Sequence, residues 1–329
     1  MPLRFTLRQL EYLIAVGEAG GVTQAAELVN VSAPSISTAI AQMEAEFGLP
    51  LFIRKHAHGL TPTGAGRAFL VQARAVIAAA DELNAIANDM SGVVRGPLGV
   101  GCLVTFAQLV LPELRRRFEQ RYDAVAVRQY ELDHGEIIER LRVADVDVGL
   151  TYDLGVPSDI VFETLAELPP FVMLSPEDPL SAASTLRPED LVDRGMVLLD
   201  LPYSGDYFLS IFSRVGLRPR IAERTRDMSV ARSMVANGFG YTVIAARAQH
   251  DLAPDGKPLC FVPLSGIAPL RLGLALSRVA HRTATVSAFV DHCRAIIGDD
   301  GVPGLWHGQP ESHGQPEPKA RRGATREAH

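Results

Sequence analysis

The fold of the N-terminal region is decided by residues 23–47, TQAAELVNVSAPSISTAIAQMEAEF. A short helix is predicted over 23–29, with Thr23 as its N-cap because a threonine hydroxyl can accept from a free backbone N–H. A turn follows at 30–31. Ser32 is expected to cap a second helix, and Pro34 fits the first turn of that helix because an N–H is not needed there.

The second helix has two chemically different faces. Its apolar residues recur at helical spacing and are Ile36, Ile40, Met43 and Phe47. The opposite face presents Ser35, Thr38 and Gln42, which are short or uncharged hydrogen-bonding side chains. A helix of this kind is suited to lie in the major groove of DNA, with its apolar face on the domain core.

These residues resemble the winged helix-turn-helix of LysR-type transcriptional regulators. The resemblance covers about sixty residues without gaps and is carried by Thr23-Gln-Ala-Ala, Val31-Ser32-x-Pro34-Ser35-x-Ser37, Glu44, Phe47-Gly-Leu-Pro-Leu-Phe-x-Arg54 and Leu60-Thr61-x-x-Gly64. On this basis the residues expected to bind DNA are Thr23, Gln24, Ser32, Ser35, Ser37, Thr38, Gln42, Arg54 and Lys55.

The recognition helix departs from the family in being poor in long side chains. Ala33 stands where many members carry Gln, and Thr38, Ala39 and Ala41 stand where they carry Arg or Gln. Of the outward groups only Gln42 can make a two-point contact with a base edge, which discriminates by about 1–3 kcal/mol. Specificity is therefore expected to depend also on DNA shape and on the wing.

The charge of the chain does not by itself indicate a DNA-binding protein. The net charge is −6, and residues 1–67 carry five basic and five acidic side chains. Arg54 and Lys55 lie together in the predicted wing, beside His56 and His58. If both cations contact phosphate in each head of a dimer, about four counterions are released and the salt slope is roughly −3.6. A single head is expected to bind weakly, so that oligomerisation supplies avidity.

A long helix is predicted after the wing, with Thr61 as cap and Pro62 at its first position. From Phe69 it carries a seven-residue repeat that continues through Val76, Leu83 and Met90. This repeat predicts a coiled-coil seam, and in the resembled family the same element is the linker helix that dimerises the heads. The alternative is a helix packed on its own domain.

Strands and helices alternate from Leu98 onward, which is typical of a parallel α/β sheet. Two such units with two crossing segments resemble the periplasmic-binding-protein-like (type 2) effector domain of the same family. The predicted fold class is α/β, with a winged helix-turn-helix, a linker helix and this two-lobed domain. The expected divisions are 1–61 for the DNA-binding domain (helix-turn-helix about 21–40), 62–91 for the linker, 92–166 with 267–298 for lobe 1, 167–266 for lobe 2, and 299–329 for a disordered tail poor in apolar residues.

The effector is expected between the lobes, since ligands of such sheets bind beyond the carboxyl ends of strands and at helix N-termini. Residues at those places, some of them matching the family's cleft positions, are Thr105, Phe106, Tyr152, Ser204, Asp227, Met228 and Thr242. An anionic or aromatic molecule is weakly preferred. The alternative is that residues such as Thr105 and Ser204 only cap helices.

Several other kinds of site are not indicated. The sequence has no metal-binding His/Cys spacing, nucleophile elbow, phosphate loop or dinucleotide fingerprint, so no metal, cofactor or catalytic activity is expected. The three cysteines (102, 260 and 293) are far apart in the sequence and are expected to be inert rather than redox-active. With no signal-like or membrane-spanning apolar run, a cytoplasmic protein without a membrane partner is expected.

The sequence thus predicts a LysR-type regulator that binds double-stranded operator DNA as a homodimer or homotetramer and responds to a small-molecule effector of unknown identity. RNA polymerase is an expected partner if the protein activates transcription. The alternative is a cytoplasmic small-molecule-binding protein or enzyme whose N-terminal helices only mediate assembly. The absence of a catalytic constellation and the polar outer face of the second helix favour the regulator.

Overall fold

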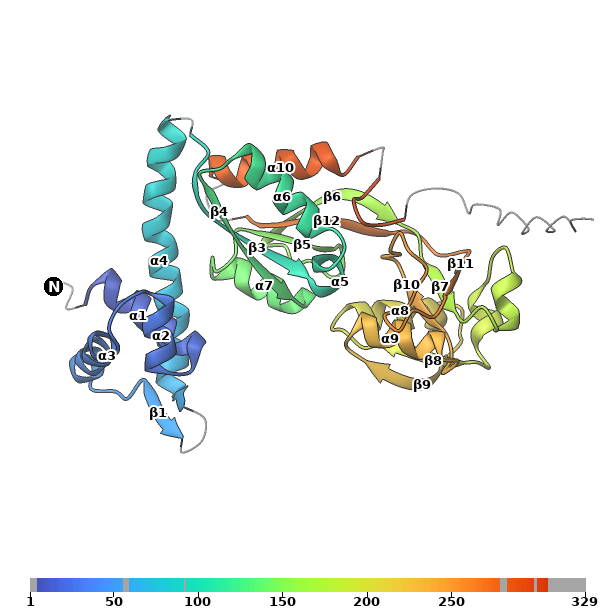
Figure 1. Cartoon of the computed structure of the whole chain (residues 1–329), viewed down its shortest axis with the longest axis horizontal. Coiled ribbons are helices and arrows are strands. Elements are labelled where there is room, and N and C mark those ends of the chain that lie inside the picture. The colour runs from blue at the N-terminus through green and yellow to red at the C-terminus, as the bar shows by residue number, and fades with distance from the viewer. Residues whose placement is uncertain (1–4, 56–58, 92, 279–282, 299–300, 307–329) are drawn as a thin grey trace, which may run out of the picture.

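The computed structural model describes residues 5–55, 59–91, 93–278, 283–298 and 301–306, which form a helical head, a long helix and two α/β lobes (Figure 1). His56 and His58 lie outside the described residues. The elements of the head are α1 (Leu7–Ala19), α2 (Val22–Leu28), α3 (Ala33–Phe47), β1 (Phe52–Lys55) and β2 (Gly59–Pro62). The long helix α4 (Gly64–Ser91) has the head at one end and leads to lobe 1 at the other.

Local capping fixes the two ends of the helix-turn-helix. Ser32 caps α3 as predicted, with its hydroxyl accepting from the Ser35 N–H. The predicted Thr23 cap of α2 is wrong, because the helix begins at Val22 and Gly21 holds the cap position without a side-chain bond. Gly20 ends α1 in the left-handed region (φ +66), and the chain turns directly after it. As a result α2 begins one residue earlier in the sequence than predicted.

The predicted start of the long helix is also wrong, by two residues. Thr61 and Pro62 pair with Ile53 and Phe52 in the wing hairpin, so the strand extends through the expected cap. Thr63 caps α4 instead, and its hydroxyl accepts from the Gly66 N–H at 2.9 Å.

Lobe 1 is a five-stranded sheet in the order β4-β3-β5-β12-β6. Its strands are β3 (Gly96–Leu103), β4 (Val125–Leu132), β5 (Val148–Tyr152), β6 (Ile160–Leu168) and β12 (Leu270–Ser277). β3 is parallel to β4 and β5, as predicted, whereas β12 runs antiparallel to both of its neighbours. The helices are α5 (Val104–Ala107), α6 (Leu111–Arg121), α7 (His134–Arg142) and α10 (Ala284–Ile296), with α6 and α10 on one face and α7 on the other (Figure 1).

Lobe 2 departs further from a parallel sheet. β7 (Phe171–Leu174) lies between β10 (Thr242–Ile244) and β11 (Cys260–Pro263) and is antiparallel to both. β8 (Gly195–Leu199) pairs in parallel with β9 (Arg220–Thr225). Two single-turn 3-10 helices and two α-helices complete the lobe: η1 (Pro179–Ala182), η2 (Pro188–Leu191), α8 (Ser204–Ser213) and α9 (Met228–Ala236).

Two stretches of chain join the lobes, one between β6 and β7 and the other between β11 and β12 (Figure 1). The sequence predicted the crossing segments near Thr164–Leu168 and Phe261–Leu264, but these residues lie largely within β6 and β11. It predicted neither of these two strands, nor β9. β6 and β9 expose many polar side chains, which weakens the hydrophobic pattern that marks a strand. The two-lobed α/β fold class is confirmed, and its parallel character is restricted to part of each lobe.

The C-terminal segment 301–306 is ordered, which corrects the prediction of disorder from residue 299. Val302 and Leu305 are buried, and the Trp306 ring packs on Phe171 of lobe 2 with centroids 5.6 Å apart. The burial of these apolar side chains opposes the entropy cost of ordering the segment. Residues 307–329 lie outside the described residues.

Candidate functional site

The outer face of α3 carries the predicted base-contacting residues. Ser35, Ser37 and Thr38 are exposed near its N-terminus, whereas Ile36 and Met43 are buried in the head core. The hydroxyls of Ser32 and Ser35 lie 2.8 Å apart, so one of them donates to the other. In helix-turn-helix proteins the N-terminal residues of the recognition helix contact the bases, and this end of α3 is open to do so.

Gln42 has a structural partner that the sequence did not predict. Its side-chain oxygen accepts from Gln9 Nε2 on α1 at 3.1 Å, which links the recognition helix to the first helix of the head. The side chain is exposed, yet its carboxamide is already engaged on one edge. The carboxamide oxygen has a second lone pair and its nitrogen two N–H donors, so two-point contact with a base is compatible with this bond.

The remaining predicted DNA contacts lie on α2 and on the wing. Thr23 and Gln24 are exposed in the first turn of α2. Arg54 and Lys55 belong to β1, where they pair in register with Leu60 and Gly59 of β2. Both basic positions therefore lie on one strand of the wing hairpin.

Glu44 fixes the wing to the recognition helix. Its Oε1 accepts from the backbone N–H groups of Leu51 and Phe52 at 2.7 and 3.1 Å. Gly66 supports the same corner, because a Cβ added there would lie 1.9 Å from the Leu51 carbonyl oxygen. The orientation of β1 relative to α3 therefore depends on one carboxylate and one close backbone approach.

The first residue of the seven-residue repeat of α4 packs on the head, and the next two are exposed to solvent. Phe69 packs against Phe47 of α3, with ring centroids 4.8 Å apart. Val76 is 41% exposed and Leu83 is 70% exposed. Two large apolar side chains at this spacing on a long helix are unusual on a free surface and fit a helix–helix seam.

A small cavity lies between the two lobes. It is lined by Thr105 and Tyr152 of lobe 1 and by Leu199, Leu201, Ser204, Phe208, Met228, Ile244, Ala245 and Ala246 of lobe 2. The space open to the centre of a water molecule is only about 10 Å³, roughly what one water needs. The lobes are therefore closed on each other in this structure.

Four of the seven predicted effector residues meet in this lining: Thr105, Tyr152, Ser204 and Met228. Thr105 Oγ1 and Ser204 Oγ are buried and have no hydrogen-bond partner among the described residues. Burial raises the pKa of the Tyr152 phenol well above its usual range, so this group is a neutral hydroxyl.

The other three predicted effector residues lie outside the lining. Phe106 is fully buried beneath Tyr152, with ring centroids 4.8 Å apart, and belongs to the lobe 1 core. Thr242 is also fully buried, two residues before Ile244 on β10. Asp227 caps α9, where its carboxylate accepts from the N–H groups of Ser229 and Val230.

The lining residues that the sequence analysis missed are Leu199, Leu201, Phe208, Ile244, Ala245 and Ala246. Leu199 ends β8 and Ile244 ends β10, so the rule that ligands lie beyond strand ends could have identified both. Ala245 and Ala246 could not be identified in this way, because an alanine side chain has no group that indicates ligand binding.

Other contacts join the two lobes. The Tyr203 ring of lobe 2 lies on His134 of lobe 1, with centroids 4.8 Å apart, and Tyr203 has a strained positive φ of +63. Arg226 of lobe 2 pairs with Asp133 of lobe 1 at 3.3 Å. Burial lowers the pKa of His134, whose Nδ1 lies 2.9 Å from Thr151 Oγ1.

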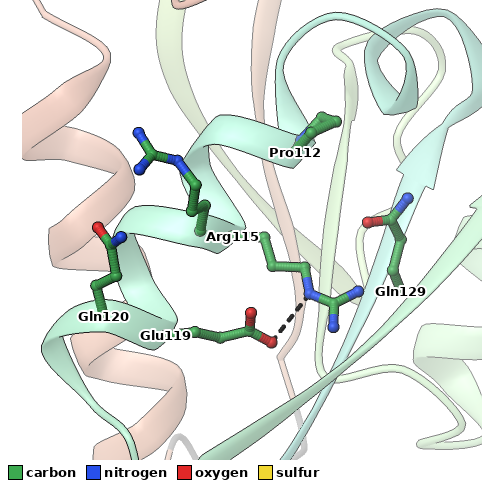
Figure 2. Close-up of a pocket in the computed structure, with 6 residues that line it drawn as sticks. Pro112, Arg115, Glu119, Gln120 and Gln129 are labelled. Carbon is green, nitrogen blue, oxygen red and sulfur yellow. Dashed lines mark hydrogen bonds and ion pairs between the residues drawn. The ribbon is translucent and has the colours of Figure 1, made fainter.

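A second depression lies on the outer surface of lobe 1, between α6 and β4 (Figure 2). It has a volume of about 490 Å³ and is lined by Pro112, Arg115, Arg116, Glu119, Gln120 and Gln129. Arg115 donates to Glu119 at 2.9 Å, so the positive charge of this arginine is partly neutralised. The depression is open to solvent and lacks the apolar lining typical of small-molecule sites.

The cysteines and acidic groups of the described chain do not form a redox or metal centre. Burial raises the pKa of the Cys293 thiol to about 12 and that of Cys102 well above its usual value, so both remain protonated. Cys260 is half-buried and free. Within the described ranges no three His, Cys, Asp or Glu side chains are grouped to hold a metal ion, and no helix is long and apolar enough to cross a membrane.

The fold and these sites define a class of protein: a winged helix-turn-helix joined by a long helix to a two-lobed domain with an interlobe cavity. Comparison with known families gives the same result. Residues 7–67 match the bacterial regulatory helix-turn-helix of the lysR family, and residues 91–297 match the LysR substrate binding domain. The chain belongs to the LysR family of bacterial transcriptional regulators and is a DNA-binding regulator.

Individual relatives extend over most of the chain. The transcriptional activator protein LysR of Escherichia coli is 29% identical over 91% of this chain and 94% of its own length. A putative LysR family regulator from Pseudomonas aeruginosa is 31% identical, with a TM-score of 0.61 over 90% of this chain and 100% of that structure. HinK from the same organism is 31% identical, with a TM-score of 0.60 over 89% of this chain and 99% of its own.

Proposed function

We propose that this regulator binds double-stranded operator DNA as a homodimer or homotetramer and that a small-molecule effector in the interlobe cavity changes this binding. The observation that carries the proposal is the pair of buried hydroxyls, Thr105 Oγ1 and Ser204 Oγ, which line one cavity and have no hydrogen-bond partner in the part of the chain that the structure describes. They come from opposite lobes, so a molecule that bonds both stabilises one arrangement of the lobes.

DNA contact is assigned to three parts of the head. The exposed residues at the start of α3 (Ser35, Ser37 and Thr38) contact base edges. Thr23, Gln24 and Ser32 contact the sugar-phosphate backbone beside them, and Arg54 and Lys55 of the wing contact phosphate. Gln42 also contacts a base edge, while its side-chain oxygen still accepts from Gln9.

Oligomerisation is assigned to α4. The exposed Val76 and Leu83 form the seam of a dimer, which places two heads about 34 Å apart, in successive major grooves. A Leu83→Glu variant is expected to reduce the mass measured by light scattering, whereas Val71→Glu, at an exposed apolar site off the repeat, is expected to leave it unchanged. Equal masses for both variants and the parent would exclude this seam.

The coupling of effector to DNA is a population shift. An effector that binds one lobe arrangement better than another moves the equilibrium toward it by its difference in affinity. Through α4 this changes the spacing of the heads on DNA. RNA polymerase is a further partner if the protein activates transcription, and the proposed site of action is the cytoplasm.

Fluorescence anisotropy on the full chain tests the DNA-binding part. Labelled DNA from upstream of its own gene is compared with random DNA at two salt concentrations. With two phosphate contacts per head, the expected salt slope is about −3.6. Arg54→Ala should weaken binding to both DNAs alike, whereas Thr38→Ala should reduce the preference for the operator. Equal binding of operator and random DNA by the parent protein, without effector and across a panel of metabolites, would refute operator recognition.

A further inference from the structure

The lining of the interlobe cavity contains no charged side chain. Seven of its ten residues are apolar, and the polar ones are Thr105, Tyr152 and Ser204, each with a hydroxyl. All three are more than nine-tenths buried, at 8%, 4% and 2% exposure. The cavity therefore offers hydrogen bonds from neutral groups inside an apolar surround.

The N-terminus of α9 is not free to hold an anion. The first free N–H groups of α9 are occupied by the Asp227 carboxylate, which accepts from Ser229 at 2.7 Å and from Val230 at 3.4 Å. The first turn of α8 carries an acidic residue, Asp206, which opposes the partial positive charge of that helix end. A second carboxylate at the start of α9 would meet like charge.

Two guanidinium groups of lobe 2 are engaged with carboxylates. Arg226 pairs with Asp133 at 3.3 Å, and Arg224 pairs with Asp200 at 2.9 Å. Neither arginine lines the cavity. An anion placed there would lose its hydration without gaining a positive partner, which is strongly unfavourable in an apolar site.

We propose that the effector is a small uncharged molecule with an apolar body and one or two hydrogen-bonding groups, of the class of neutral carboxamides and alcohols. This inference rests on the proposed function, in which the interlobe cavity is the effector site. The polar group of the effector bridges Thr105 Oγ1 of lobe 1 and Ser204 Oγ of lobe 2, and both hydroxyls are thereby satisfied. Its apolar body contacts Leu201, Phe208 and Met228.

The closed cavity requires a movement to admit this molecule. The present space of about 10 Å³ holds no more than a water. Met228 is the most adaptable side chain of the lining, since it is unbranched and has three rotatable bonds. It is also only half-buried, so it is the residue expected to move as the lobes separate slightly.

Matched pairs of neutral and anionic probes test the effector class on the full chain. Benzamide is compared with benzoate, and isobutyramide with isobutyrate, so that shape is held nearly constant while charge changes. Binding is measured by isothermal titration calorimetry and by the shift in melting temperature. We expect at least one amide to bind, with its carboxylate at least about tenfold weaker because the anion is desolvated without a partner.

Two cavity variants and a matched control assign the site. Ser204→Ala and Thr105→Val each remove one hydroxyl with little change in shape, and each should weaken amide binding about fivefold. Ser213→Ala changes an exposed serine of the same helix, α8, and should leave binding unchanged. Equal losses in all three variants would overturn the assignment of the hydroxyls.

The outcomes separate the effector class from the proposed function. Carboxylate binding at least as tight as amide binding, and lost in Ser204→Ala, would overturn the neutral class while leaving the cavity as the effector site. Failure of every amide to bind would also overturn it, leaving an ordered water as the partner of the hydroxyls. Operator binding of the ligand-free protein is measured separately, and its failure bears on the proposed function alone.

Discussion

Arg74 of α4 lies beside Asp145 of lobe 1, with Nε 3.8 Å from the Asp145 Oδ1 carboxylate oxygen. The same guanidinium reaches the head, where Nη2 lies 3.3 Å from Glu18 Oε1 of α1. Asp145 is held in turn by Arg140 of α7 at 3.1 Å. One side chain on the long helix therefore contacts both the DNA-binding head and the effector domain, and a movement of lobe 1 relative to α4 must change these pairs.

A double-mutant cycle on this pair should show coupling to DNA binding. Arg74→Met and Asp145→Asn are each expected to change operator affinity, and their effects should be non-additive by up to about 1 kcal/mol because the pair is partly exposed. The corresponding cycle on Arg142 and Asp159, a lobe 1 pair at 2.7 Å, serves as the control and should give additive, near-zero effects. Additive effects at Arg74 and Asp145 would show that this contact does not transmit the state of lobe 1.

The carboxylate of Glu44 is expected to stabilise the wing. Glu44→Ala leaves the N–H groups of Leu51 and Phe52 without their acceptor, which should lower the free energy of unfolding by about 1–3 kcal/mol. Glu44→Gln keeps an acceptor oxygen, so its free energy of unfolding should fall by less. Urea unfolding measures both, and Glu27→Ala, at an exposed site on α2, is the control. A loss as small for Glu44→Ala as for the control would mean that other contacts position β1.

Local chemistry made much of this structure predictable. The Ser32 cap and the apolar stripe of α3 depend on residues within a few positions of one another, and both were found from the sequence. Thr105 and Ser204 were found because strand ends and helix starts converge on the cleft in two-lobed α/β domains. Their burial without a partner could not be predicted, since it depends on how far the lobes close.

Long-range contacts account for what the sequence did not show. Gln42 meets Gln9 only because α1 crosses α3 in the folded head. Trp306 has no apolar repeat around it, and its order comes from contact with Phe171 and Arg247, which lie far away along the chain. The low apolar content of the last residues was a poor guide there, because Val302, Leu305 and Trp306 pack against the rest of the protein.

The free energy of unfolding is expected to decrease as the pH is lowered below about 6.5, and protonation of His134 is one cause. Burial lowers the pKa of this histidine in the folded protein, although Asp133 and Asp153 partly oppose the effect. The unfolded chain binds a proton near pH 6.5 that the folded chain does not accept, so the free energy of unfolding decreases by up to about 1.4 kcal/mol per pH unit for this group.

The His134→Gln variant should reduce this pH dependence, as measured by urea unfolding at pH 7.5 and 5.5. Glutamine keeps a hydrogen-bonding group toward Thr151 and does not titrate. His292, whose pKa is also lowered by burial, remains in the variant and retains its part of the slope. An unaltered slope in His134→Gln would mean that His134 titrates alike in the folded and unfolded chain.

The C-terminal segment should be held to lobe 2 by a cation–π cluster around Arg247. The guanidinium carbon of Arg247 lies 4.4 Å from the Trp306 ring centroid, 4.7 Å from that of Phe261 and 5.5 Å from that of Phe171. Trp306 is the single tryptophan of the chain, so its fluorescence reports the docking of segment 301–306 directly.

Arg247→Met keeps an apolar side chain but removes the cation, and it should shift Trp306 emission to longer wavelength as the ring gains contact with water. Loss of a partly desolvated cation–π contact should lower the free energy of unfolding by about 0.5–2 kcal/mol. Arg218→Met, at an exposed arginine of the same lobe, is the control and should change neither quantity. A Trp306 spectrum identical in Arg247→Met and the parent would show that the segment is held without the cation–π contacts, by its apolar side chains and the contact with Phe171.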